Sequence, residues 1–214
     1  MSIEYTNPNE IEARSFEIIG EELARLGKTP DGPRAFIVKR CIHASADFDY
    51  ADSLYFSEGA VEAISAALVS GVGVVTDTQM ALAGISKTAA GKLGVGLRCF
   101  MADEDVAARA KALGITRAAV SVEKAAASGE RLIFAVGNAP TALLKLHELT
   151  RQGYEPAGII AAPVGFVNVV ESKELIIRGK APCIAARGRK GGSSIAAAIV
   201  NAFLYEILKT GGGL

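Results

Sequence analysis

The chain of 214 residues contains no tryptophan and only three cysteines and two histidines. Cys41, Cys99 and Cys183 are odd in number and lie far apart, and no CxxC pair or Cys/His cluster accompanies them. This spacing predicts neither a disulfide framework nor a zinc site, and we expect no metal centre of the protein's own.

The sequence also lacks an excess of positive or negative residues and any long apolar run. The 23 Lys and Arg residues balance 23 Asp and Glu residues, which argues against a nucleic-acid partner but leaves a locally charged anion site open. No uninterrupted apolar stretch approaches about 18 residues, and the polar, acidic start is unlike a signal peptide. We therefore expect a cytoplasmic protein without a membrane partner.

The length and the 50% hydrophobic content suit a single domain over residues 1–214. Helical patterns dominate an N-terminal part, about 8–70, with helices expected at 8–27, 35–48 and 57–70. A strand is the competing interpretation for "AFIVKRCI", because this stretch is β-branched and apolar.

The pattern changes in a second part, about 71–209, where short apolar runs alternate with helical patterns. The runs lie at 72–77, 95–100, 132–137, 157–163 and 181–188, and the helical patterns at 78–86, 103–112, 119–128, 140–152, 166–178 and 192–209. Runs that are apolar throughout suit strands covered on both faces. The alternation predicts an α/β fold with a doubly wound, five-stranded parallel sheet.

Polar residues follow these runs, where open α/β sheets bind ligands. Asp77, Thr78 and Gln79 follow the first run. After the last come Arg187, Arg189 and Lys190, then Gly191 and a helix start. Cations, glycines and a helix N-terminus together predict an anion site, although a solvated basic turn has the same composition.

His43 lies one helical turn after Arg40. In a helix these two and Asp47 share one face, whereas in a strand Arg40 and His43 point to opposite faces. An imidazole titrates near neutral pH and can act as a general acid, yet most lone histidines on helices are surface residues. Ser15 and His147 have ordinary structural interpretations, Ser15 as a helix residue bonded to the preceding turn.

Several common motifs are missing. The chain has no GxxxxGK[ST] phosphate loop, no GxGxxG followed by a helix and no GxSxG elbow. Nucleotide binding and serine-nucleophile hydrolysis are therefore poorly supported.

Five segments in series resemble the precorrin-8X methylmutases of cobalamin biosynthesis. They are "KRCIHASADFDYADSL", "DTQMALAGI", "PTALLKL", "AAPVGFVNVVESKE" and "CIAARGRKGGSSIAAAIVNA", and the resemblance extends from about residue 8 to 208.

The resemblance implies a homodimer with a flavodoxin-like, three-layer α/β/α fold. It implies an isomerase that moves a methyl group from C-11 to C-12 of precorrin-8X, or of cobalt-precorrin-8, without a cofactor. His43 would protonate a ring nitrogen and promote a 1,5-sigmatropic shift, and Ser15 and Arg40 would contact the substrate. Hand-over of the product to neighbouring pathway enzymes would follow.

The substrate carries many carboxylates, which suits Arg40 and the cations at 187–190. We expect Thr78 and Gly191 to line the same site, by their position after predicted strands. Two alternatives stay open from the residues: a non-catalytic tetrapyrrole or corrinoid carrier on the same scaffold, and a nucleotide- or flavin-binding protein.

Overall fold

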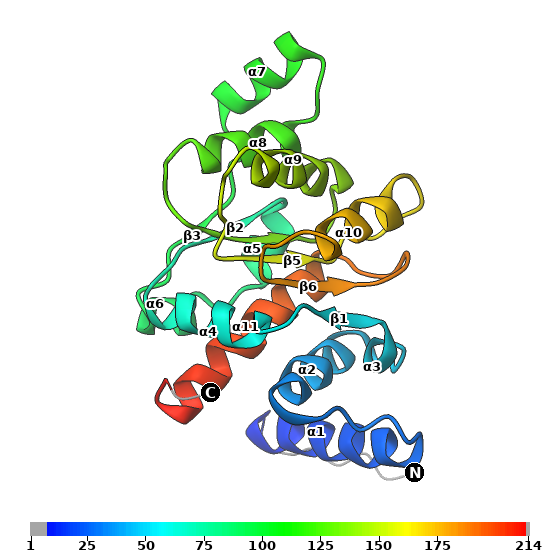
Figure 1. The fold of residues 1–214 in the computed structure, drawn as a ribbon. Coiled ribbons are helices and arrows are strands. Elements are labelled where there is room, and N and C mark those ends of the chain that lie inside the picture. Colours follow the sequence, from blue (N-terminus) through cyan, green and yellow to red (C-terminus); the bar gives the residue numbers. More distant parts are fainter. Residues whose placement is uncertain (1–7, 213–214) are drawn as a thin grey trace.

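A computed structural model describes residues 8–212, whose strands form one six-stranded sheet (Figure 1). The strands are β1 (Leu54–Phe56), β2 (Val74–Thr76), β3 (Leu97–Arg98), β4 (Ile133–Val136), β5 (Gly158–Ala161) and β6 (Cys183–Ala186). Their spatial order is β1-β6-β5-β4-β2-β3. Each of the five predicted apolar runs contains one strand, so the prediction of an α/β sheet is confirmed.

The sheet departs from the prediction at one edge. β1 pairs with β6 in antiparallel register, with Leu54 opposite Ala186, while the other five strands pair in parallel. The structure therefore extends the predicted five parallel strands by a sixth strand, which is antiparallel. β1 was missed because three residues between two helices leave too short a pattern to read as a strand.

The helices surround this sheet. Before the sheet's second strand come α1 (Pro8–Arg25), η1 (Gly32–Arg34), α2 (Ala35–Ser45), α3 (Tyr50–Ser53) and α4 (Ala60–Val69). The rest are α5 (Gln79–Gly84), α6 (Lys87–Lys92), α7 (Glu104–Leu113), α8 (Arg117–Ala126), α9 (Pro140–Arg151), α10 (Val169–Ile177) and α11 (Ser193–Thr210). The helix expected at 78–86 ends at Gly84, and a second one begins at Lys87.

The four inner strands β2, β4, β5 and β6 are buried on both faces, whereas both residues of the edge strand β3 are half-buried. In β4, Ile133 and Ala135 belong to one hydrophobic core, whereas Phe134 and Val136 belong to another. α1, α2, α4 and α11 contribute to the first core and α8, α9 and α10 to the second, on the other side of the sheet (Figure 1). Within residues 8–212 no helix is both long and apolar enough to cross a bilayer.

The competing interpretations of 35–48 are resolved in favour of a helix. α2 packs along α11 and buries Ile37, Val38, Cys41 and Ile42. It ends earlier than expected, at Ser45, because Ala46 adopts a left-handed conformation with φ of 55°. This early end sends the following residues away from the face that carries His43.

Candidate functional site

His43 lies on the exposed side of α2, opposite the buried face of this helix. Its imidazole stacks on the ring of Phe16 from α1, with centroids 5.0 Å apart and an angle of 17° between the planes. The stacking fixes the orientation of the imidazole and leaves one ring face open. An oriented, solvent-accessible imidazole is suited to donating a proton to a bound ligand.

Arg40 lies beside His43 and contacts the same phenylalanine. Its guanidinium carbon is 4.6 Å from the Phe16 ring centroid and 5.0 Å from that of Tyr205 on α11. The guanidinium also forms an ion pair with Glu12. Two aromatic rings and a carboxylate thus hold the cation in place, which prepares it for a planar, anionic ligand.

Ser15 belongs to the same part of α1 as Phe16. Its hydroxyl donates a hydrogen bond to the backbone oxygen of Ile11, 2.8 Å away, in the preceding turn. This is the structural interpretation that the sequence allowed. The hydroxyl oxygen keeps acceptor capacity, so Ser15 can still accept a hydrogen bond from a ligand.

Asp47 does not share the face of Arg40 and His43, which corrects the expected arrangement. Because α2 ends at Ser45, Asp47 lies beyond the helix and forms an ion pair of 2.6 Å with Lys190. This ion pair lowers the pKa of the Asp47 carboxyl. Asp49 binds the same ammonium at 2.6 Å, so the turn after α2 is joined to the loop between β6 and α11.

Thr78 lies at the end of β2, as predicted, and caps α5. Its hydroxyl oxygen accepts a hydrogen bond from the backbone N–H of Ala81 and lies 2.8 Å from the hydroxyl of Ser193, the first residue of α11. The start of α5, after β2, and the start of α11, after β6, therefore meet at this edge of the sheet, although more than a hundred residues separate them in sequence.

Asp77, next to Thr78, anchors this edge of the sheet. Its buried carboxylate accepts hydrogen bonds of 2.7–2.8 Å from the backbone N–H groups of Gly137, Asn138 and Ala139 at the end of β4. Burial raises the pKa of Asp77, while the three donors oppose that rise. Asp77 thus has a structural role, because it joins the end of β2 to the end of β4.

Lys173 in α10 supports the predicted anion loop, 187–192. This buried ammonium donates 2.8 Å hydrogen bonds to the backbone oxygens of Gly188 and Lys190. Gly191 has a φ of 156°, and a Cβ there would lie 2.2 Å from the backbone oxygen of Ala162. Glycine is required because the loop passes against the end of β5.

The three predicted cations of this loop occupy different surroundings. Lys190 is paired with two carboxylates, and Arg187 lies 3.6 Å from Glu174 and over the ring of Tyr55. Arg189 lies over the ring of Phe166 and forms no ion pair with a residue in the described range 8–212. Arg189 is therefore the cation of the loop that is most available to a new anion.

Exposed apolar side chains lie just after the strands at the same edge, one in the first turn of α5 and two on the loop after β5. Met80 is 73% exposed after β2, and Phe166 and Val167 are 82% and 77% exposed after β5. Large apolar side chains concentrated on loops near polar strand ends are typical of a site for a broad apolar ligand or a partner.

Metal binding finds no support among residues 8–212, where no three His, Cys, Asp or Glu side chains gather into a possible ligand set. Cys41, Cys99 and Cys183 are all free thiols. Burial raises the pKa of the Cys41 thiol, which makes this neighbour of Arg40 an inert core residue.

Sequence reasoning missed the residues that hold the site from a distance. Glu12, Phe16 and Tyr205 surround Arg40 but come from α1 and α11, with no recognisable spacing relative to α2. Lys173 in α10 was not among the residues that the sequence singled out. Its burial could have been anticipated only from its place among the inward-facing positions of this helix.

The comparisons with known proteins agree on one family. The family model of precorrin-8X methylmutase matches residues 10–206. The cobalt-precorrin-8 methylmutase of Salmonella typhimurium is 43% identical over 94% of this chain and 96% of its own length. The precorrin-8X methylmutase of Pseudomonas aeruginosa is 42% identical over 78% of this chain and 81% of its own.

A solved structure shares the fold. The precorrin-8X methylmutase of Thermus thermophilus superimposes with a TM-score of 0.84 at 37% identity, over 95% of this chain and 99% of that one. A family model spanning most of the chain and full-length relatives above 40% identity lead to one conclusion: the chain belongs to the precorrin-8X methylmutase family.

Proposed function

We propose that this chain is an isomerase that moves a methyl group from C-11 to C-12 of precorrin-8X, or of its cobalt-containing counterpart. The products are hydrogenobyrinate and cobyrinate. The names of full-length relatives support the reaction. The observation that carries it to this structure is the oriented His43 imidazole beside the aromatic-bound Arg40.

His43 is the proposed acid. Its proton, given to a ring nitrogen, makes the conjugated system electron-poor, so the bond from C-11 to the methyl group breaks as the bond to C-12 forms. The proton then returns to the imidazole, and atoms and electrons balance without a redox partner. One well-placed acid contributes about 10²–10⁴-fold to the rate.

Substrate carboxylates are the proposed ligands of the surrounding polar groups. Arg40 binds a substrate carboxylate in addition to Glu12, and the Ser15 hydroxyl turns from the backbone oxygen of Ile11 to donate a hydrogen bond to the same carboxylate. At the strand ends, the proposed contacts are Thr78, Arg187, Arg189, Lys190 and Gly191. Since Lys190 already binds Asp47 and Asp49, a carboxylate there would join an existing network.

The His43→Ala variant tests the reaction. We expect turnover, followed by the absorbance change from substrate to product, to fall about 10²–10⁴-fold while product binding is retained. Added imidazole should restore part of the rate, because it can occupy the space of the missing side chain. Supplying the metal-free and the cobalt-containing substrate in parallel identifies the natural one.

The same assay, run with wild-type protein and with His43→Ala, distinguishes an enzyme from a carrier. Wild-type protein that binds the product yet converts neither substrate would establish a non-catalytic tetrapyrrole or corrinoid carrier. Undiminished turnover by His43→Ala would remove His43 from the mechanism while leaving the reaction intact.

We also propose that the five parallel strands form a flavodoxin-like core. Numbered among themselves, the parallel strands have the order 2-1-3-4-5, which is the flavodoxin order.

We propose further that two copies of the chain associate in the cytoplasm and that the product passes directly to a neighbouring pathway enzyme. The exposed apolar residues at the strand ends support an association of two copies.

A further inference from the structure

A hollow opens at the opposite edge of the sheet from the proposed active site. Its volume is about 600 Å³, within the range of small-molecule sites. It is lined by residues that come directly before β4, β5 and β6, by the last turn of α9 and by the residues just after α10. We call it the amino-edge pocket, since it lies where these parallel strands begin.

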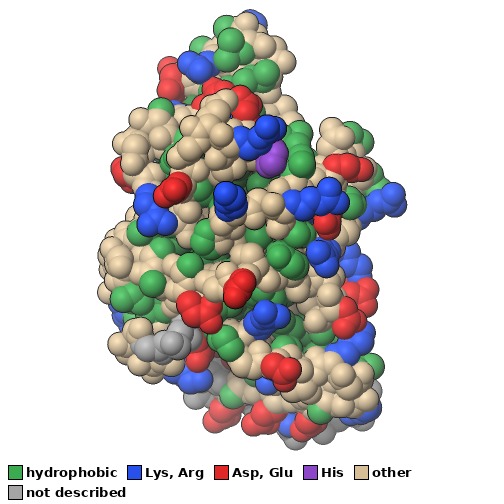
Figure 2. Space-filling model, in the orientation of Figure 1, with side chains coloured by type: hydrophobic (Ala, Val, Ile, Leu, Met, Phe, Trp, Pro, Cys, Tyr) green, Lys and Arg blue, Asp and Glu red, His purple; other side chains and the backbone are tan. Residues whose placement is uncertain are grey.

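The described lining of the amino-edge pocket is strongly cationic. It contains Arg131, Arg151, Arg178 and Lys180, against one carboxylate, Glu155. Figure 2 shows Lys and Arg side chains gathered around a histidine on this face. Such a surplus stands out in a chain whose total charges balance, and it attracts anions from solution.

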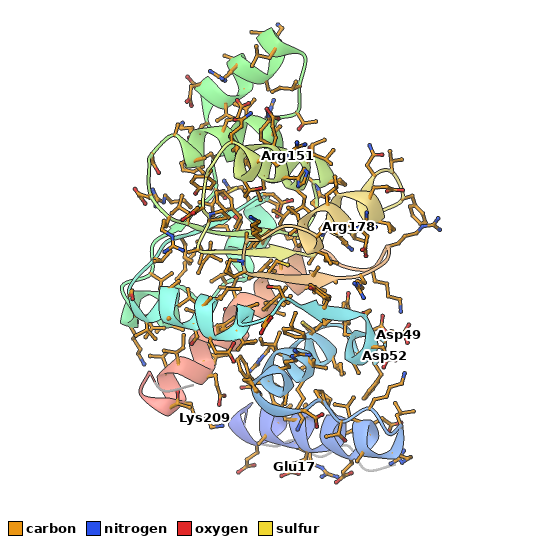
Figure 3. All side chains as sticks on the ribbon, viewed as in Figure 1. Glu17, Asp49, Asp52, Arg151, Arg178 and Lys209 are labelled. Atoms are coloured by element: carbon orange, nitrogen blue, oxygen red, sulfur yellow. The ribbon has the colours of Figure 1, made fainter. Side chains whose placement is uncertain are left out.

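These four cations are unpaired in a molecule that pairs many others. None of them forms an ion pair with any residue from 8 to 212, whereas nearby Arg98 binds Glu130 and Lys145 binds Glu123 and Glu148. Arg151 ends α9 and Arg178 directly follows α10, at helix C-termini where helix dipoles favour cations (Figure 3). Helix ends do not account for Arg131, which precedes β4, or for Lys180, which precedes β6.

The pocket also has a firm apolar side. Pro156 is buried, and the ring of Tyr154 packs edge-on against Phe134 with centroids 6.0 Å apart. The Tyr154 hydroxyl donates a hydrogen bond to the backbone oxygen of Glu130 at 3.1 Å, which fixes the ring. A rigid apolar wall with cations opposite is the arrangement that a small organic anion requires.

We propose that the amino-edge pocket binds a small organic molecule with at least two carboxylate or phosphate groups, at a site separate from the methyl-transfer site. Guanidinium groups bind both kinds of oxyanion in a two-pronged manner, so arginines supplied by two helices can hold two anionic groups at once. The apolar wall takes the carbon skeleton between them.

Calorimetric titration of the full chain tests this proposal with two probes, pyrophosphate for phosphates and citrate for carboxylates. We expect saturable binding of one probe molecule per chain for at least one of the two. The Arg151→Gln/Arg178→Gln variant should weaken it about tenfold or more. Binding of pyrophosphate alone or of citrate alone identifies the oxyanion.

A matched variant controls for charge. Lys87→Gln/Lys92→Gln removes two exposed cations on α6, across the sheet, and should bind the probe like the wild type. Equal weakening in both double variants, or no saturable binding of either probe, overturns the proposal. Lys180→Gln provides a second test if the double arginine variant does not fold.

Turnover separates this pocket from the active site. Without added anion, the Arg151→Gln/Arg178→Gln variant should convert the tetrapyrrole at the wild-type rate. A parallel loss of turnover and of probe binding would make these arginines part of the methyl-transfer site and contradict a separate pocket.

Discussion

Lys173 is fully buried although its side chain ends in a charged ammonium group. The ammonium has no carboxylate partner in the described chain and donates to two backbone oxygens of the loop between β6 and α11. Burial lowers its pKa from 10.5 to about 8. Lys173 thus orders the proposed anion loop, and the free energy needed to bury its charge depends on pH.

This shift predicts how the stability of the protein varies with pH. Between pH 8 and 10.5 the unfolded chain holds the Lys173 proton and the folded chain releases it, so the contribution of Lys173 to stability rises with pH. Compared with Lys173→Met, wild-type protein should gain up to about 3 kcal/mol of unfolding free energy between about pH 7 and pH 10. Urea unfolding of both proteins measures this. Parallel pH profiles would contradict it.

At the residue scale, local patterns revealed His43 and its relation to Arg40, because both lie on one helix. They could not reveal Phe16, Glu12 or Tyr205, whose contacts depend on how three helices pack. The expected role of Asp47 failed for a local reason: the left-handed Ala46 ends α2 two residues too early for the shared face.

The loop from β6 to α11 depends on one glycine. Gly191 lies so close to the end of β5 that an alanine Cβ would meet the backbone of Ala162. Its φ of 156° would also strain any residue other than glycine at this position. Gly191→Ala should therefore displace the loop, lower the unfolding free energy by about 2–4 kcal/mol and weaken substrate binding. Thermal unfolding and product titration measure the two effects.

Gly188 in the same loop provides the control. Its φ of 75° is also unusual, but an added Cβ would meet nothing within 4 Å. Gly188→Ala should cost only the backbone strain, about 1 kcal/mol. Equal costs for the two variants would show that contact with β5 does not hold the loop.

At the element scale, four of the five parallel strands could be predicted because each is an apolar run that is buried on both faces. The half-buried strand β3 could be predicted because it continues the alternation of short runs with helical patterns. β1 could not, since its three residues become a strand only by pairing with β6, about 130 residues later. The strand order was likewise beyond reach, because it results from packing between distant segments.

The whole molecule leaves large apolar side chains exposed at one edge of the sheet. Met80 lies in the first turn of α5, after β2, and Val164, Phe166 and Val167 lie on the loop after β5, beside the proposed substrate contacts. A second copy of the chain placed there would cover these side chains and enclose a broad macrocycle between two surfaces. This arrangement accounts for apolar exposure and for a site that one chain leaves open.

Phe166→Glu/Val167→Glu tests the association of two copies, because two charges buried at an interface would separate them. We expect wild-type protein to sediment as a dimer and this variant as a monomer with weaker product binding. Leu113→Glu/Ile115→Glu places the same charges on exposed apolar positions at the end of α7 and should stay dimeric. A monomeric wild type would contradict the homodimer, and a dimeric Phe166→Glu/Val167→Glu variant would locate the interface elsewhere, away from the substrate edge.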